Sequence, residues 1–337
     1  MNCAWSFDDN YAQHGGISML SLFENNRDID EINVWLLVNN VSDDNRRRLE
    51  QIGRDYGRRI TFVEMQDAAK KMKTKTKFNL SSYGRLFLAD IEGVDRMLYL
   101  DSDTVVCDSL APLLDLDMTG TLWAGVQDAV NPYFTRAVGY GAADRYINAG
   151  GVGVFNLDLW RRLNVVERCL DYISLWDGHT PLDDQGTLNH VCYGRTKITH
   201  PRYNVINQFF LFPAKTSKRR SRVNTYYTQE EIDDAVARPA VVHYCVQVFN
   251  RPWFEDCTHP YRYRYEAYKA MSPWAEVTAR PAWRPRIAAI EKWVYERLPK
   301  CMFTLMGHYI WAKHELTDRH PKGAREVRRL DSSCEHS

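Results

Sequence analysis

The stretch 98-LYLDSDTVV-106 decides how this chain folds, because two carboxylates stand between two apolar, β-forming runs. The pattern predicts a buried strand that ends in a charged pair. Residues i and i+2 of a strand point to one side, so Asp101 and Asp103 can converge on one point. Two like charges at that separation are costly unless a cation lies between them. The stretch indicates a site for Mg²⁺ or Mn²⁺, which bind carboxylate oxygens and substrate phosphates; a solvated Asp-rich turn is the alternative.

Strands and helices are predicted to alternate before this stretch. Residues 2–7, 32–38 and 60–63 are apolar and rich in β-formers, and Ser42 is expected to cap the helix between the last two. This alternation favours βαβ units and a mostly parallel sheet in an α/β fold. Such sheets bind ligands beyond the carboxyl ends of their strands. One crevice at that edge is expected to collect four polar side chains: Asp8, Asn10, Asp101 and Asp103.

The totals exclude several classes of protein. A chain of 337 residues with 45% hydrophobic content is long enough for one large α/β domain with a smaller appendage. The 44 basic and 43 acidic side chains nearly cancel, so no nucleic-acid partner is expected. Eight scattered cysteines, without a C-x-x-C pair or a signal peptide ahead of them, indicate a cytoplasmic protein with reduced thiols. No apolar run approaches the roughly twenty residues of a membrane span.

Further helices and loops are predicted downstream. A helix is expected from residue 14 to residue 25, and Arg85 is predicted to open an apolar helix, from which its guanidinium can fork onto phosphate or sugar oxygens. Residues 158–176 are predicted as one helix. Residues 182–189 are predicted to begin another, whose leading carboxylate Asp183 can simply cap it. The basic runs at 70–77 and 215–222 are interpreted as a solvated helix end and a charged loop.

Polar residues also end the later strands. Residues 121–126 are predicted as a strand that leads to Asp128, and residues 146–156 combine small residues, which allow close backbone approach, with an apolar run. A short strand at residues 240–244 carries His243. A lone His is usually structural, but its position after a complete α/β domain and before Arg251 favours ligand binding.

Taken in order, these motifs resemble family 8 of the glycosyltransferases, which are retaining, metal-dependent enzymes. The likeness is to bacterial galactosyl- and glucosyltransferases that build lipopolysaccharide, and it covers residues 1–271. It implies the GT-A fold, a Rossmann-like, mostly parallel sheet flanked by helices. It rests on six motifs: Asp8-Asp9-Asn10-Tyr11, Ser82-Tyr83-Gly84-Arg85-Leu86, Leu98-Tyr99-Leu100-Asp101-Ser102-Asp103, Asn148-Ala149-Gly150, Asp184-Gln185, and His243-Tyr244 with Arg251-Pro252-Trp253.

The resemblance implies roles for individual residues. Asp101, Asp103 and His243 match metal ligands, which implies Mn²⁺ or Mg²⁺ as cofactor. Asp8 and Asn10 match contacts to uracil and ribose, which implies a UDP-sugar donor. The remaining donor-binding positions are Arg85, Ser102, Asn148, Ala149 and Arg251, and the catalytic positions are Asp128, Asp184 and Gln185. The chain departs from the family pattern at Arg251, where Lys is usual.

The expected activity is transfer of a hexose, galactose or glucose, from UDP to a glycan or glycolipid with retention of configuration. Because an amide, Gln185, stands at the position nearest the anomeric carbon, same-face displacement is favoured over a covalent intermediate on Asp128 or Asp184. The alternatives are an inverting GT-A transferase, a nucleotidyltransferase, or a non-catalytic protein that binds UDP-sugars or glycans.

A second region is expected after the catalytic domain, with the division at residues 1–271 and 272–337. Residues 281–330 hold eleven Lys and Arg against five Asp and Glu. Ile287, Ile290, Val294 and Leu298 recur at helical spacing, with Trp and Tyr along the flanks. Basic, aromatic helices of this kind suit an anionic membrane surface, here the cytoplasmic face. The alternative is that they dock on the catalytic domain.

Overall fold

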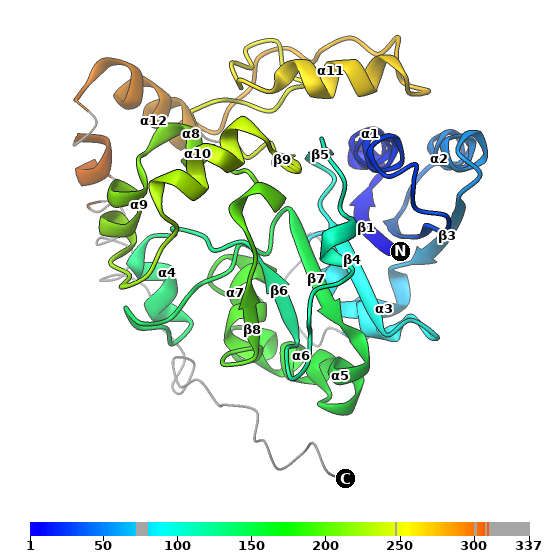
Figure 1. Ribbon diagram of the computed structural model, residues 1–337, viewed down its shortest axis with the longest axis horizontal. Helices are drawn as coiled ribbons and strands as arrows, with labels where there is room; N and C mark the ends of the chain where they lie inside the picture. The colour runs from blue at the N-terminus through cyan, green and yellow to red at the C-terminus, as the bar shows by residue number, and fades with distance from the viewer. Residues whose placement is uncertain (72–79, 247, 300–301, 307–308, 310–337) are drawn as a thin grey trace.

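The structure, a computed structural model, describes residues 1–71, 80–246, 248–299, 302–306 and 309 (Figure 1). Most of the basic run at 70–77 and the C-terminal end of the appendage, residues 310–337, lie outside the described residues.

A seven-stranded, mostly parallel sheet forms the centre of the molecule, in the order β3-β2-β1-β4-β7-β6-β8. β7 runs antiparallel to both of its neighbours, and the other pairs are parallel. The strands predicted from apolar runs are present, with ends that differ by a few residues at most. Their bounds are β1 (Asn2–Asp8), β2 (Asn33–Asn39), β3 (Arg59–Glu64), β4 (Arg96–Leu100), β6 (Trp123–Gly125) and β7 (Val152–Asn156). The edge strand β8 (Thr196–Ile198) was not predicted.

Helices cover both faces of this sheet, because alternate strand residues enter two separate cores. Trp5 of β1 packs in the core that contains Leu20 and Leu49, on the side of α1 (Asp9–Asn25) and α2 (Asp43–Asp55). The neighbouring Ala4 packs on the other side, against η1 (Gly84–Asp90), α5 (Leu157–Arg162) and α6 (Val165–Leu175).

A separate two-stranded antiparallel sheet lies beside α1 and joins β5 (Thr104–Val106) to β9 (Val241–His243). The strand expected at 240–244 therefore lies outside the main sheet. Its register pairs Thr104 with His243. The Thr104 hydroxyl lies 2.9 Å from the hydroxyl of Ser18 on α1. This small sheet therefore fixes the chain directly after the Asp pair.

Helix boundaries correct several expectations. Ser42 caps α2 by accepting a hydrogen bond from the Asn45 backbone, as predicted. α1 begins directly after β1, five residues before the expected start at residue 14. The expected helix 158–176 is two helices, because Asn164 takes a left-handed conformation with φ of 50° between them. The expected loop at 215–222 is mostly α9 (Ala214–Ser221). The remaining elements are α3 (Gln66–Lys71), η2 (Ala111–Leu113), α4 (Pro132–Ala137), α7 (Asp183–Val191), η3 (Pro201–Tyr203), α8 (Asn207–Leu211), α10 (Gln229–Ala237), α11 (Arg262–Ala270) and α12 (Arg286–Arg297).

The described part of the C-terminal region docks one face on the rest of the protein and leaves another exposed. Val294 of α12 and Phe303 pack with Phe212 and Val248, which agrees with the docking alternative. Figure 1 shows α12 beside α8 and α9, and α11 across β5, β9 and α1. The outer face keeps large apolar side chains exposed: Trp283, Ile287, Ile290, Trp293, Met302, Leu305 and Tyr309. Within the described residues, no helix has the length and apolarity needed to cross a membrane.

Candidate active site

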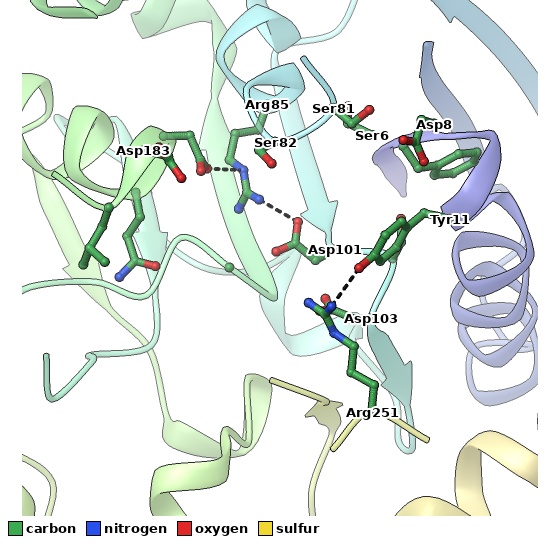
Figure 2. Close-up of a pocket in the computed structure, with 16 residues that line it drawn as sticks. Ser6, Asp8, Tyr11, Ser81, Ser82, Arg85, Asp101, Asp103, Asp183 and Arg251 are labelled. Atoms are coloured by element: carbon green, nitrogen blue, oxygen red, sulfur yellow. Dashed lines mark hydrogen bonds and ion pairs between the residues drawn. The ribbon is translucent and has the colours of Figure 1, made fainter. Parts of the chain in front are cut away.

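A cavity of about 350 Å³ opens at the carboxyl ends of β1 and β4. Figure 2 shows the polar side chains that face it from segments far apart in the sequence. The two strands are neighbours in the sheet, so Asp8 and Asp101 reach one edge, as predicted. The lining residues are Ser6, Phe7, Asp8, Tyr11, Ser81, Ser82, Arg85, Asp101, Ser102, Asp103, Gly150, Leu182, Asp183, Asp184, Gln185 and Arg251.

Asp101, Asp103 and His243 form a cluster that fits a divalent cation. One ligand atom from each lies within 4.8 Å of the others. The pairing of β5 with β9 brings His243 to the Asp pair, and its Nε2 lies 3.3 Å from Asp103 Oδ1. Two carboxylate oxygens and an imidazole nitrogen are donors that Mn²⁺ accepts, and the open cavity leaves room for further oxygen ligands.

Both carboxylates of this cluster are already paired with arginines. Arg85 Nη2 donates to Asp101 Oδ1 at 2.6 Å, and Arg85 Nε lies 2.8 Å from Asp184 Oδ2. Arg251 Nη2 donates to Asp103 Oδ2 at 2.9 Å. The Arg85 guanidinium therefore binds carboxylates from two segments, where the sequence predicted binding to phosphate or sugar oxygens.

The electrostatics of the cluster follow from burial and these pairs. Burial opposes ionisation of Asp103, but His243 and Arg251 outweigh burial and hold the Asp103 pKa well below its usual range. Burial also disfavours the imidazolium of His243. Cys245 and Asp103 outweigh that effect and hold the His243 pKa well above its usual value. Burial raises the pKa of Asp184 to about 7, although Arg85 acts in the opposite direction.

Asp184 and Gln185 are presented to the cavity by a strained turn. Leu182 and Asp183 both take left-handed conformations, with φ of 56° and 50°, before α7 continues. Leu182 is the N-cap residue, so the predicted capping position at Asp183 is wrong; Asp183 lines the cavity instead. A Cβ on Gly186 would stand 1.7 Å from the Pro181 carbonyl oxygen. The turn therefore requires glycine there.

Three side-chain amides converge on the buried carboxylate of Asp128. Asn148 Nδ2 donates to its Oδ2 at 2.6 Å, and Gln185 Nε2 donates to the same oxygen at 3.3 Å. Gln208 Nε2 donates to Oδ1 at 3.3 Å. Burial raises the pKa of Asp128, while the Asn148 and Gln185 hydrogen bonds act against that rise. Asp128 thus anchors Gln185 from behind the cavity.

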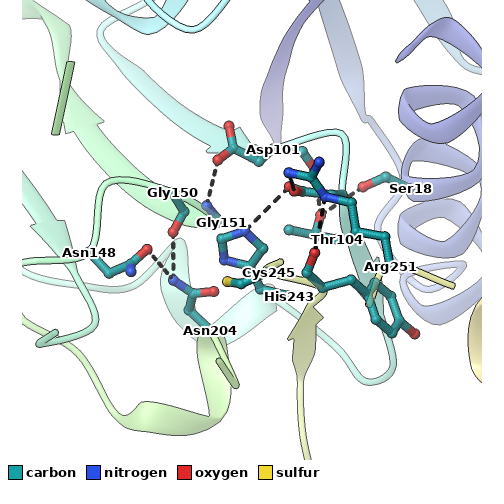
Figure 3. A network of polar contacts seen from close by, with 12 residues as sticks. Ser18, Asp101, Thr104, Asn148, Gly150, Gly151, Asn204, His243, Cys245 and Arg251 are labelled. Atoms are coloured by element: carbon teal, nitrogen blue, oxygen red, sulfur yellow. Dashed lines mark hydrogen bonds and ion pairs between the residues drawn. The ribbon is translucent and has the colours of Figure 1, made fainter. Parts of the chain in front are cut away.

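A backbone turn links this amide cluster to Asp101 (Figure 3). The Gly151 N–H donates to Asp101 Oδ2 at 2.8 Å, and Asn204 Nδ2 donates to the Gly150 carbonyl at 2.7 Å. Gly151 has φ of 98°, and a Cβ there would stand 2.1 Å from Asn204 Oδ1. The close approach that small residues predicted for this stretch is made by the Asn204 side chain.

The sequence matches the model of a known enzyme family. Residues 2–257 match the family described as glycosyl transferase family 8. The chain belongs to this family.

Two curated relatives and one solved structure illustrate the similarity. The family 8 chain is 28% identical to General stress protein A of Bacillus subtilis, over 81% of this chain and 93% of the relative. It is 25% identical to Lipopolysaccharide 1,2-glucosyltransferase of Escherichia coli K12, over 84% of this chain and 81% of the relative. The crystal structure of the galactosyltransferase LgtC with donor and acceptor sugar analogs superposes with a TM-score of 0.66, at 24% identity, over 81% of this chain and 96% of that one.

Family membership makes this protein a glycosyltransferase, and the superposition shows the expected GT-A fold.

The remaining predicted donor residues occupy different environments. Asp8 lines the cavity, and its buried Oδ1 has no hydrogen-bond partner among the described residues. Ser102 also lines it. Asn10 is exposed and Ala149 is buried in a core, and neither lies among the residues that line the cavity.

Two amides of this family 8 site were not predicted from the sequence. Asn204 supports the glycine turn, and Gln208 of α8 holds Asp128. The available signal was a group of amide residues at 204, 207 and 208 inside an otherwise apolar stretch. Polar residues in such a stretch are expected to be buried and hydrogen-bonded.

Proposed function

We propose that this enzyme transfers galactose or glucose from UDP to a hydroxyl group of a glycan or lipid-linked saccharide, with retention of configuration and with Mn²⁺ or Mg²⁺ as cofactor. The observation that carries the proposal is the Asp101, Asp103 and His243 cluster beside a cavity that also contains Asp184 and Gln185. The names of the lipopolysaccharide glucosyltransferase and of LgtC support the sugar and acceptor class.

The cluster and the other residues of the cavity would bind different parts of the donor. A cation bound to the cluster would neutralise charge on the departing UDP as a Lewis acid. The unpartnered oxygen of Asp8 is available to accept an N–H of the base, a role that supports uracil recognition. Arg251 lines the cavity beside Asp103, where its guanidinium can bind diphosphate oxygens.

Same-face displacement agrees best with the environment of the carboxylates. Asp128 is 6% exposed, accepts three amide hydrogen bonds and lies behind the residues that line the cavity. In that arrangement Asp128 holds the Gln185 amide in place and is poorly placed to attack a sugar. Asp184 lines the cavity but is paired with Arg85, an arrangement suited to gripping sugar hydroxyls. The leaving diphosphate is then the remaining base for the incoming hydroxyl group.

The test is a donor panel. Purified protein is incubated with Mn²⁺ and UDP-, GDP- or CMP-sugars, with and without candidate acceptors, and release of the nucleotide is measured. We expect turnover of UDP-galactose or UDP-glucose that EDTA abolishes, and an anomeric proton coupling in the product that matches the donor. Faster turnover of a GDP- or CMP-sugar would overturn the donor assignment. Binding of UDP-sugars without any turnover would favour the non-catalytic alternative.

We also propose that the C-terminal region, predicted from the sequence as residues 272–337, binds an anionic membrane at the cytoplasmic surface through the exposed apolar face of α12. The support is the exposure of Ile290 and Trp293, at 54% and 52%, on the outer face of α12. Aromatic and aliphatic side chains beside basic ones suit that interface. In co-sedimentation with phosphatidylglycerol vesicles, I290S/W293S is expected to lose binding. L175S, which changes an exposed leucine on α6, is the matched control. Equal sedimentation of both variants would contradict the proposal.

A further inference from the structure

Every oxygen of the two metal-binding carboxylates has a protein partner. Asp101 accepts from Arg85 on Oδ1 and from the Gly151 N–H on Oδ2. Asp103 faces His243 with Oδ1 and Arg251 with Oδ2. A divalent cation needs oxygen lone pairs from both residues, and it is repelled by guanidinium groups at hydrogen-bond distance. A cation therefore has to compete with arginines that already neutralise its ligands.

The two arginines differ in how firmly they are held. The Arg85 side chain is 5% exposed, bridges Asp101 to Asp184, and has its guanidinium 4.5 Å from the centre of the Tyr99 ring. The Arg251 side chain is 24% exposed and has a single carboxylate partner. Its other side-chain hydrogen bonds go to the Tyr11 hydroxyl at 2.7 Å and to a backbone carbonyl at 3.4 Å, and its guanidinium lies farther from the nearest ring centres, 5.5 Å from Trp253 and 5.7 Å from Tyr11. Arg251 is the partner that can leave.

We propose that Arg251 is a positioning residue that acts as an exchangeable counter-ion: it occupies Asp103 in the nucleotide-free enzyme and transfers to the diphosphate when UDP or a UDP-sugar binds. This inference rests on the proposed function. A diphosphate offers Arg251 several charged oxygens, which a guanidinium binds in a bidentate manner. The move frees Asp103 Oδ2 for the cation at the moment when the phosphates reach it.

The consequence is that cation and nucleotide bind cooperatively. Without nucleotide, the cation has to displace Arg251 and leave a partly buried guanidinium without its charge partner. With nucleotide, the diphosphate supplies that partner. Coupling between two ligands is reciprocal, so the cation tightens UDP binding by the same factor as UDP tightens cation binding.

The experiment measures Mn²⁺ binding directly, by the electron paramagnetic resonance signal of free Mn²⁺, with and without saturating UDP. The variants are R251M, which removes the counter-ion, and R251K, which keeps its charge. R280M is the matched control, because Arg280 is an exposed arginine whose Nη2 donates to the Asn10 carbonyl at 3.4 Å and makes no contact with Asp103. Thermal unfolding establishes that each variant is folded.

We expect R251M to bind Mn²⁺ alone about tenfold more tightly than wild type, and UDP to improve that affinity by a smaller factor than in wild type. R251K and R280M are expected to remain within about threefold of wild type, because each keeps a positively charged side chain at position 251 paired with Asp103. Mn²⁺ affinity in R251M equal to wild type or weaker would overturn the counter-ion role while leaving the proposed function intact. Wild-type protein that binds no Mn²⁺ even with UDP would refute both.

Discussion

Replacing Arg85 by Met tests the ion pairs that join the acidic cluster at Asp101 to the turn that carries Asp184. Arg85 is 5% exposed, and its partners Asp101 and Asp184 are 18% and 11% exposed. Removing one partner of a buried pair typically costs about 3–5 kcal/mol. Asp101 faces the cavity and keeps the Gly151 N–H, so most of the cost falls on Asp184. We expect the free energy of unfolding to fall by about 3 kcal/mol at pH 8.

The loss is expected to depend on pH. Burial raises the pKa of Asp184 to about 7 in the wild type, and loss of the Arg85 charge raises that pKa further. A raised carboxyl pKa contributes stability that is present below the unfolded-state pKa and is lost as pH rises through the folded-state value. At about pH 5 the carboxyl is protonated in both proteins, so the loss falls to about 1 kcal/mol.

Urea unfolding at the two pH values, followed by tryptophan fluorescence, measures both losses. R162M is the control, because it breaks an exposed pair between Arg162 and Asp158 that is expected to contribute at most about 1 kcal/mol. A loss below about 1 kcal/mol for R85M at pH 8, or an equal loss at both pH values, would refute the reasoning.

Three further predictions concern the turn before α7, the acid Asp184 and the proposed third metal ligand, His243. G186A is expected to lower kcat by at least about tenfold, because its Cβ would collide with the Pro181 carbonyl and displace Asp184 and Gln185. G141A is the control, because a Cβ there would lie 3.7 Å from its nearest neighbour. Wild-type kinetics for both variants would contradict the role of the turn. Wild type is expected to lose stability between about pH 5 and pH 8, because the raised pKa of Asp184 favours its protonated form in the folded protein. D184N is expected to lose less over that range, since it lacks the titrating carboxyl group. Urea unfolding midpoints that fall equally with pH in the two proteins would argue against this. H243A is expected to weaken Mn²⁺ binding in calorimetry by about tenfold or more while UDP binding without metal persists, and unchanged Mn²⁺ affinity would remove His243 from the ligand set.

The strands and the acidic cluster were predictable because each depends on short-range pattern. Apolar runs such as 2–7 and 32–38 defined the strands, and parallel pairing then brought Asp8 and Asp101 to one edge. The break at Asn164 was missed because a left-handed residue interrupts helical periodicity without removing the apolar residues on either side. α9 was missed because basic residues dominate it, although Ala214, Ser217 and Ser221 supply a small buried face.

The parts of the site that escaped prediction depend on long-range pairing. Asn204 and Gln208 approach Asn148 and Asp128 because β8 and the helices after it fold back beside β6. The pairing of the two carboxylates with arginines is likewise invisible in a motif, because Arg85 and Arg251 come from opposite halves of the chain. A motif indicates which residues are available for a cation, whereas the tertiary structure determines which partners already occupy them.

The pairing of β5 with β9 also has a consequence for biosynthesis. β5 and Asp103 leave the ribosome long before β9, and the sheet from β1 to β4 can begin to assemble while His243 is still to be made. His243, the third residue of the cluster, reaches the two carboxylates only when Val241–His243 joins β5. A chain that stops short of residue 243 keeps both carboxylates and lacks the imidazole. Under the proposed function, firm retention of a cation would therefore distinguish a molecule synthesised through β9 from an unfinished one.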